Sequence, residues 1–213
     1  MKLGVSEIYA SIQGESSHAG RPCTFVRLAG CPLRCRWCDT VYSFDAGEMM
    51  TIEAIVAKVA ALGLPLVELT GGEPLAQRPA PALVEALCQA GHEVLIETSG
   101  AYPVSGIDAR AKIIADLKCP GSNEAARNRM DVLAALRSVD ELKIVVADRA
   151  DFDWARSQLD GPLATTEATI LWSAVHGELQ PATLAAWLLA ERPRGRMQLQ
   201  LHKILWPEID RGV

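Results

Sequence analysis

Three cysteines stand close together at Cys31, Cys35 and Cys38, and their type and spacing suit metal chemistry. Cysteine thiolates are the usual protein ligands of iron–sulfur clusters. Three of them in one short run can hold three corners of a cluster, and no fourth cysteine accompanies them in that run. An iron atom without a protein ligand can bind another molecule, so the spacing indicates a reactive cluster in preference to a purely structural one.

A structural zinc ion is the main alternative for these cysteines. Zinc in closed structural sites takes four ligands, and Cys23 or His18 supplies a fourth only from outside the compact run. A disulfide is a weaker alternative. The first residues lack the long apolar segment of a secretory signal, so we expect a cytoplasmic protein, in which thiols stay reduced.

A second candidate segment is Thr70-Gly71-Gly72-Glu73-Pro74. Two consecutive glycines let the backbone come close to a ligand, and the Glu73 carboxylate can accept hydrogen bonds from an ammonium group. Taken alone, the segment is equally well a turn between a strand and a helix. Similarly, Trp37 can pack on a planar group at the open iron or simply cover the core.

Composition narrows the class of protein. The chain has 213 residues, of which 49% are hydrophobic, so it can build one sizeable core. The formal net charge of -5 argues against broad binding to nucleic acid. The apolar runs are too short or too polar to span a bilayer, so we expect no membrane segment.

Strand-like and helical patterns alternate along the chain, and they are the elements that must position the candidate residues. Several apolar runs are rich in Val, Ile and Leu, which is typical of strands in a parallel sheet that is buried on both faces. The expected strands are residues 5–12, 24–28, 66–69, 94–98, 113–116, 142–146, 169–173 and 197–201. The expected helices are residues 52–62, 80–90, 130–138, 149–159 and 181–191.

This alternation predicts an α/β fold with right-handed crossovers. A closed eightfold barrel usually needs about 250 residues, and much of the segment 30–50 looks like loop. We therefore expect a single domain over residues 1–213, built as a partial, incomplete TIM-like barrel with mostly parallel strands. Local signals support two helix starts and one end, namely Thr51 as an N-cap, Pro181 as a first helical residue and Gly63 as a stop.

The candidate residues fall where such a fold collects its active site, at the carboxyl ends of the strands. Candidate residues follow six of the expected strands. In chain order these residues are Gln13-Gly14-Glu15, Cys31, Thr70, Glu97-Thr98-Ser99-Gly100, Lys118 and His202-Lys203.

The cysteine run, with Trp37 before its last member, resembles the signature of radical S-adenosylmethionine enzymes. The resemblance implies a [4Fe-4S] cluster on Cys31, Cys35 and Cys38, with S-adenosylmethionine at the open iron. Reductive cleavage of that cofactor would release a 5′-deoxyadenosyl radical, so no protein side chain is assigned as catalytic.

The flanking segments narrow the resemblance to the 7-carboxy-7-deazaguanine synthase family, over nearly the whole chain. They are Gln13-Gly14-Glu15, Arg27 four residues before Cys31, and Cys38-Asp39-Thr40. The implied reaction is the radical ring contraction of 6-carboxy-5,6,7,8-tetrahydropterin to 7-carboxy-7-deazaguanine with release of ammonia, in queuosine and deazapurine biosynthesis.

The resemblance also implies the residues of the site. For S-adenosylmethionine these are Trp37, Cys38, Asp39, Gly72, Glu73, Ser99, Asp116, Leu117, Lys118 and Ser173. For the substrate they are Ile12, Gln13, Gly14, Glu15, Arg27, Thr70 and His202, among which the fork of Arg27 matches a carboxylate. Thr40 is the implied ligand of Mg²⁺, although Asp39-Thr40 alone also suits a turn. In some relatives the chain ends soon after the His-Lys pair, with its carboxylate near the substrate. Six residues follow Pro207 here, so that role is not carried over.

Partners and rivals complete the expectations. The resemblance implies a homodimer and an electron donor such as flavodoxin or ferredoxin, and no nucleic-acid or membrane partner is expected. The first rival is a radical enzyme that activates glycyl-radical proteins, which shares the three-cysteine run but acts on a protein. Gln13-Gly14-Glu15 and Arg27 favour a small carboxylated substrate instead. The second rival is a non-enzymatic zinc module.

Overall fold

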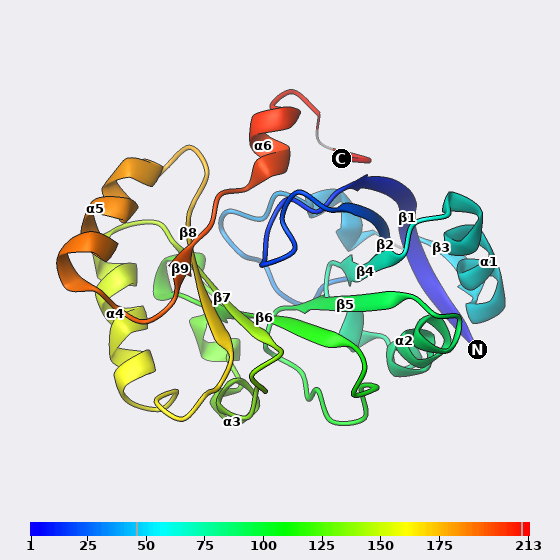
Figure 1. Cartoon of the computed structure of the whole chain (residues 1–213), viewed down its shortest axis with the longest axis horizontal. Coiled ribbons are helices and arrows are strands. Elements are labelled where there is room, and N and C mark those ends of the chain that lie inside the picture. The colour runs from blue at the N-terminus through cyan, green and yellow to red at the C-terminus, as the bar shows by residue number, and fades with distance from the viewer. Residues whose placement is uncertain (46, 210) are drawn as a thin grey trace.

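One curved sheet forms the centre of the molecule (Figure 1). The computed structural model describes residues 1–45, 47–209 and 211–213. The strand order is β3-β1-β2-β4-β5-β6-β7-β8-β9, with β1 antiparallel to β2 and β3 and every pair from β2 to β9 parallel. The strands are β1 (Lys2–Ile12), β2 (Pro22–Leu28), β3 (Glu48–Thr51), β4 (Leu66–Gly71), β5 (Glu93–Thr98), β6 (Lys112–Lys118), β7 (Glu141–Val146), β8 (Thr169–Ala174) and β9 (Arg196–Met197).

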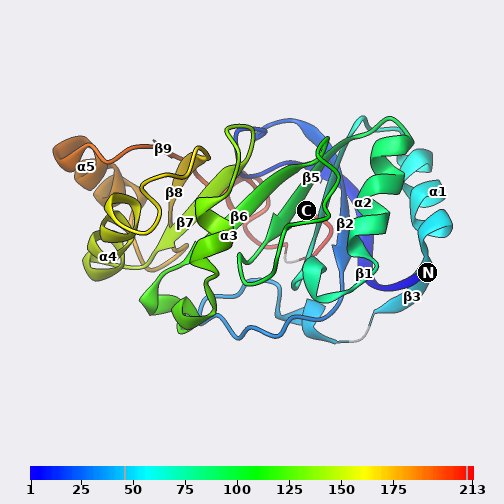
Figure 2. The same ribbon diagram turned by 90° about the horizontal axis from the view of Figure 1, so that it is seen from below.

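Helices cover the outer side of this sheet. In Figure 2, seen from below, α2 and α3 lie in front of the strands, whereas α6 lies on the other side of the sheet in Figure 1. The helices are α1 (Ile52–Leu62), α2 (Ala80–Gln89), α3 (Met130–Ala134), α4 (Arg149–Asp160), α5 (Pro181–Glu191) and α6 (Leu201–Leu205). Among the described residues, no helix is long and apolar enough to cross a membrane.

The expected helix signals act as predicted in α1 and α5. Thr51 Oγ1 accepts a hydrogen bond from Ala54 N at 3.2 Å, which satisfies one of the free donors of the first turn. Gly63 ends α1 in the left-handed conformation, with φ of 70°. Pro181 opens α5, which ends at Glu191 as expected.

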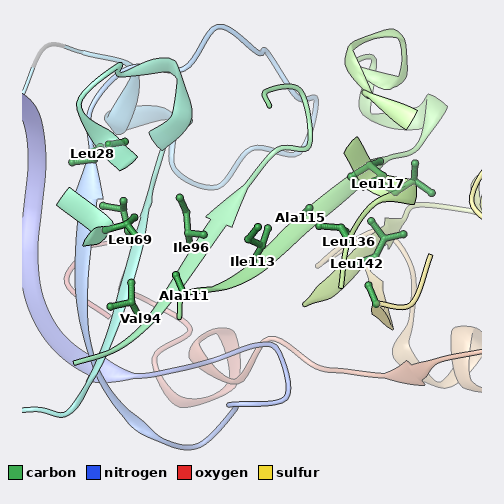
Figure 3. Close-up of a cluster of buried hydrophobic side chains, with 14 of the residues drawn as sticks. Leu28, Leu69, Val94, Ile96, Ala111, Ile113, Ala115, Leu117, Leu136 and Leu142 are labelled. Atoms are coloured by element: carbon green, nitrogen blue, oxygen red, sulfur yellow. The ribbon is translucent and has the colours of Figure 1, made fainter. Parts of the chain in front are cut away.

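Alternation along the strands separates two faces with different chemistry. Outward side chains such as Leu28, Leu69, Ile96 and Ala115 form the large core (Figure 3). The inward side chains include a smaller apolar cluster of Cys23, Phe25, Leu66, Leu95 and Ile114. Further along the same strands toward their carboxyl ends, the inward side chains are polar, and there the barrel holds a site.

Two expectations about the elements were wrong in detail, and one strand was not expected. The strand expected at 197–201 is limited to β9, and Leu201 already begins α6. The side chains of this segment bind the loop after β1 instead of extending the sheet: Gln198 Oε1 accepts from Ser16 N at 2.7 Å, and Gln200 Nε2 donates to Glu15. The helix expected at 130–138 ends at Ala134, and β3 was not expected at all. The partial barrel with mostly parallel strands is confirmed.

Candidate active site

A cavity of about 470 Å³ opens at the carboxyl ends of the parallel strands, where the sequence placed the site. It brings together segments that are far apart in the chain. The predicted site residues that line it are Ile12, Gln13, Gly14, Glu15, Arg27, Cys31, Cys35, Trp37, Cys38, Asp39, Thr40, Thr70, Gly72, Ser99, Asp116, Lys118 and His202.

The three cysteines of the run are half-buried and free, and all line this cavity. Burial raises the pKa of the Cys31 and Cys35 thiols, so they need a cationic partner to become thiolates. Gly72 lies directly behind the run, since a Cβ on it would come within 2.7 Å of Cys31 Cβ. A backbone hydrogen bond also connects the two segments, because Glu73 N donates to Gly30 O at 2.9 Å. The donor set and the close backbone packing fit an iron–sulfur cluster held on three sides.

The zinc alternative has no preformed counterpart in the structure. No three His, Cys, Asp or Glu side chains within the described residues are arranged to hold a single metal ion. Cys23 is fully buried among apolar side chains. His18 contacts Arg21 and Lys112 rather than a thiol, and its pKa is lowered by burial. Neither residue joins the run as a fourth ligand.

Glu73 is fully buried and does not line the cavity. Its carboxylate accepts hydrogen bonds from Thr98 Oγ1 at 2.8 Å, from Ser99 N at 2.7 Å and from Leu75 N at 2.9 Å. The Glu73 side chain therefore fixes Ser99, which does line the cavity. A direct contact between Glu73 and an ammonium group stays a prediction. In the structure the carboxylate holds Ser99 in place.

Two other predicted residues are not brought to the cavity. Leu117 points outward into the large core because it alternates with Asp116 and Lys118, which point inward. A contact between Leu117 and S-adenosylmethionine stays a prediction, and it would involve the Leu117 backbone. Ser173 is buried and is not among the lining residues.

A buried cluster of charges lies at the centre of the cavity wall. The Lys143 ammonium contacts Glu97, lies 3.1 Å from Glu15 Oε2 and lies 3.6 Å from Asp116 Oδ1. Lys118 Nζ donates to Asp116 Oδ2 at 2.6 Å. Glu97 and Lys143 also line the cavity, although neither was predicted to bind a ligand. The signal that could have found Lys143 is a charged residue inside an otherwise apolar strand.

Burial and neighbouring charge set the protonation of this cluster. Burial alone would raise the pKa of Glu97, but the Lys143 ammonium outweighs it and holds that pKa at about 2. The three carboxylates in turn raise the pKa of Lys143 well above its usual value, against the effect of burial. Lys143 and Glu97 are therefore a charged pair at neutral pH.

Arg27 is held in place by a separate network. Its Nε donates to Glu7 Oε1 at 2.9 Å and its Nη2 donates to the Tyr9 hydroxyl at 3.0 Å, while the Tyr42 hydroxyl donates to the same Glu7 oxygen at 2.7 Å. Within the described residues, Nη1 has no hydrogen-bonding partner, and the side chain lines the cavity. An arginine held in this way offers a pre-oriented donor to an anionic ligand.

The loop after β1 and the C-terminal segment close the cavity from one side. Leu201 N donates to Gly14 O at 2.9 Å, and a Cβ on Gly14 would come within 2.5 Å of His202 Nδ1. A larger residue at position 14 would therefore force His202 to shift. Burial lowers the pKa of His202.

The last residue also reaches the cavity, which the six residues after Pro207 did not suggest. Val213 lines the cavity, and its main-chain oxygen accepts a hydrogen bond from the Tyr9 hydroxyl at 3.2 Å. Arg211 stacks over Tyr42 with 4.1 Å between the guanidinium carbon and the ring centroid. Val213 thus contacts the cavity wall through Tyr9.

Thr40 follows the cysteine run and lines the cavity. Its hydroxyl lies 3.8 Å from Cys38 Sγ and makes no side-chain cap to the short helix that follows. A hydroxyl of this kind is an available oxygen for Mg²⁺, which accepts few protein ligands and completes its shell with water and ligand oxygens.

Comparison with known proteins agrees with this geometry. Residues 26–121 match the Radical SAM superfamily. The 7-carboxy-7-deazaguanine synthase of Chlorobaculum tepidum is 47% identical over 99% of this chain and 97% of that protein. The 7-carboxy-7-deazaguanine synthase of Koribacter versatilis is 41% identical over 99% of this chain and 100% of that protein.

Solved structures show the same fold. The crystal structure of QueE from Escherichia coli superposes with a TM-score of 0.79 at 22% identity and covers 94% of each chain. SuiB from Streptococcus suis, bound to its precursor peptide, gives a TM-score of 0.61 at 9% identity and covers 80% of this chain and 46% of that one. The close relatives confirm the resemblance seen in the sequence: the chain belongs to the 7-carboxy-7-deazaguanine synthase family of radical S-adenosylmethionine enzymes.

Proposed function

We propose that the chain converts 6-carboxy-5,6,7,8-tetrahydropterin to 7-carboxy-7-deazaguanine with release of ammonia, for queuosine and deazapurine biosynthesis. The observation that carries this proposal is one cavity lined both by the cysteine run and by the pre-oriented Arg27. A radical generator and a carboxylate-binding group then share one enclosed space. The single domain over residues 1–213 supplies every residue of this arrangement.

Cys31, Cys35 and Cys38 would hold a [4Fe-4S] cluster, and Gly72, Ser99, Asp116 and Lys118 would hold S-adenosylmethionine beside it. When bound, these groups supply the 5′-deoxyadenosyl radical that takes hydrogen from substrate carbon C6 and later returns it.

The protein's own contribution is placement near this centre. The Glu73 carboxylate holds Ser99 toward the cavity, and Lys118 is neutralised by Asp116 at 2.6 Å. Both arrangements are supported by hydrogen bonds that exist before any ligand enters, so little reorganisation is needed on binding.

Substrate binding is assigned to other residues that line the cavity. Arg27 binds the substrate carboxylate through its free nitrogen, and Glu15 accepts from ring amino groups. Backbone atoms at Ile12 and Gly14 read the ring edge, with Thr70 and His202 as further contacts. The C-terminal segment that packs on Gly14 limits the access of water to the radical.

Mg²⁺ on Thr40 is part of the proposal and is supported by the position of its hydroxyl at the cavity wall, where Cys38 Sγ lies 3.8 Å away. The ion would orient the substrate carboxylate for ring contraction. We further propose a homodimer that works in the cytoplasm and receives electrons from a flavodoxin or ferredoxin.

The deciding test is anaerobic turnover of 6-carboxytetrahydropterin by reconstituted protein with S-adenosylmethionine, reductant and Mg²⁺. The expected product is 7-carboxy-7-deazaguanine, identified by mass and absorbance. If protein with a full cluster cleaves S-adenosylmethionine but forms no deazaguanine, the proposed substrate is refuted. Glycyl-radical formation on an added protein would instead favour the rival activase.

A further inference from the structure

Glu68 is a buried acid that none of the roles above uses. It lies on β4, is 2% exposed and lines the cavity. Its neighbours across the sheet are Phe25 on β2 and Leu95 on β5, both in the small inner apolar cluster. Burying a carboxyl group in such a setting costs free energy unless the group is hydrogen-bonded and uncharged or paired.

The two oxygens of Glu68 have different surroundings. Oε2 accepts a hydrogen bond from Gln13 Nε2. Gln13 Oε1 already accepts from Glu15 N at 2.5 Å, so the amide is fixed with its NH₂ group toward Glu68. Within the part of the chain that the structure describes, Oε1 has no partner. It is also not among the buried polar atoms that lack one, so it keeps access to the cavity.

The charge state of Glu68 follows from its environment. Burial, and then the negative charge of Glu97, raise its pKa well above the usual value. Gln13 is a neutral donor and Lys143 is already shared by three other carboxylates. These surroundings favour the neutral carboxylic acid, in which Oε1 can carry the proton and act as a donor.

The depth of Glu68 suits one end of a bicyclic substrate. Gly72 on the same chain segment packs against Cys31. Glu68 comes four residues earlier, which is roughly 13 Å deeper along an extended strand. The reacting carbon must lie near the cysteine run, so the far ring of the substrate lies deep in the cavity, beside Gln13 and Glu68.

We propose that Glu68 is a substrate-binding residue that sets ring specificity, in which Oε1–H donates to the carbonyl oxygen of the pyrimidinone ring while Gln13 holds Oε2. This inference rests on the proposed function and extends it. It predicts that the site reads the ring through a neutral acid, in addition to the ionised Glu15.

The test measures binding of 6-carboxypterin, which is fluorescent and unreactive here. The protein is the reconstituted holoenzyme with S-adenosylmethionine and without reductant. Glu68→Gln keeps a donor and an acceptor in the same places, so its Kd should stay within about threefold of wild type. Glu68→Met keeps the volume but loses the donor, and its Kd should rise about tenfold. Equal binding by Glu68→Met, or equal losses in both variants, would overturn the proposal.

A ligand comparison separates contact from loop support. The 4-amino analogue of 6-carboxypterin lacks the carbonyl acceptor, so wild type should bind it more weakly, and Glu68→Met should lose that preference. If the substitution only loosens Gln13, the affinity for both ligands should fall by the same factor. That result would overturn the contact between Glu68 and the ring. If wild type turns over the substrate but Glu68→Met still prefers 6-carboxypterin over the 4-amino analogue, only this inference is refuted. Wild type that binds no pterin refutes the proposed function itself.

A spectroscopic measurement covers the case in which Glu68→Met does not fold. Difference infrared spectra of wild type should show a protonated carboxyl band that shifts when 6-carboxypterin binds. Glu68→Gln should lack that band. A band that persists in Glu68→Gln, or an ionised carboxylate in wild type, would overturn the proposal.

Discussion

Lys143 Nζ lies 3.1 Å from Glu15 Oε2, and this ion pair joins a strand to a loop that follows a strand elsewhere in the sheet. Lys143 belongs to β7, and Glu15 belongs to the loop after β1. The same ammonium contacts Glu97 on β5 and Asp116 on β6. One buried cation therefore balances three carboxylates that line the cavity, and it couples the stability of the fold to the geometry of the site.

Replacing this cation should destabilise the protein strongly. Lys143→Met keeps much of the side-chain length but leaves buried carboxylates without a counter-charge, which costs about 3–5 kcal/mol in comparable cases. Urea unfolding at pH 7 measures the loss. Lys58→Met is the control, because Lys58 is 55% exposed and lies 4.0 Å from Glu48, so its loss should be under about 1 kcal/mol. Equal effects of the two changes would contradict this account.

The same cluster predicts a direction of pH dependence. The pKa of Glu97 is about 2 in the folded protein, against an ordinary value of 4.5. A depressed pKa contributes stability above the unfolded value, and that stability is lost as the pH falls from 4.5 toward 2. In Lys143→Met this component should disappear. The difference in unfolding free energy between wild type and the variant should therefore shrink as the solution is acidified, and a constant difference would count against the assignment.

Removal of one thiol should abolish cluster assembly. Cys35→Ala leaves two ligands in the run, so anaerobic reconstitution should give far fewer than the about four irons per chain expected for wild type. Cys88→Ala is the matched control, because Cys88 is a nearly buried residue of α2 in the large core. Iron content and the visible charge-transfer band are the readouts. Full iron loading of Cys35→Ala would exclude it as a ligand.

A methyl group at Gly72 should disturb the same run through packing alone. Its added Cβ would lie within 2.7 Å of Cys31 Cβ, so the run must shift. Gly91→Ala provides the control, because Gly91 has a φ of 89° but open space around it. We expect Gly91→Ala to lose about 1 kcal/mol of stability with full iron content. Gly72→Ala should lose cluster content and affinity for S-adenosylmethionine, and an unchanged cluster would show that the run tolerates displacement.

Local signals were enough to predict the elements that depend on them. Thr51, Gly63 and Pro181 act within their own turns, so the bounds of α1 and α5 follow from nearby residues. The strand predicted at 197–201 failed because Gln198 and Gln200 bind a loop more than 180 residues away in the chain. The alternation of polar and apolar residues gives no information about a binding partner so distant in the chain.

The site was predictable in its parts and less so in its connections. The cysteine run and Arg27 stand out by type and spacing, and the structure gathers them in one cavity. Glu73 looked like a ligand-binding acid, yet its carboxylate is used by Thr98 and Ser99. No role was predicted for Lys143, because its partners come from other parts of the chain. A charge inside an apolar strand signals a buried pair but does not name its partner.

Arg27 should control substrate affinity without affecting the cluster. Arg27→Met removes the fork and leaves Glu7 and Tyr9 without their partner, so KM for the carboxylated substrate should rise about 100-fold. Arg27→Lys should recover only part of this loss, because an ammonium group cannot reproduce the fork. Arg110→Met, on an exposed arginine paired with Asp108, is the control. Loss of iron in Arg27→Met would make the residue structural.

Thr40 should confer the response to Mg²⁺. Thr40→Val keeps the shape of the side chain and removes the only oxygen it could offer to an ion, whereas Thr40→Ser keeps that oxygen. We expect turnover by Thr40→Ser to rise with added Mg²⁺ as in wild type, and the half-saturating Mg²⁺ concentration of Thr40→Val to increase at least about tenfold. Thr24→Val is the control, because Thr24 is buried in β2 and its hydroxyl has no partner within the described residues. The cluster content of all three variants should match wild type, which separates an ion-binding role from damage to the neighbouring Cys38. If Thr40→Val responds to Mg²⁺ as wild type does, the ion is held without Thr40, and the orientation of the substrate carboxylate must then rest on Arg27 alone.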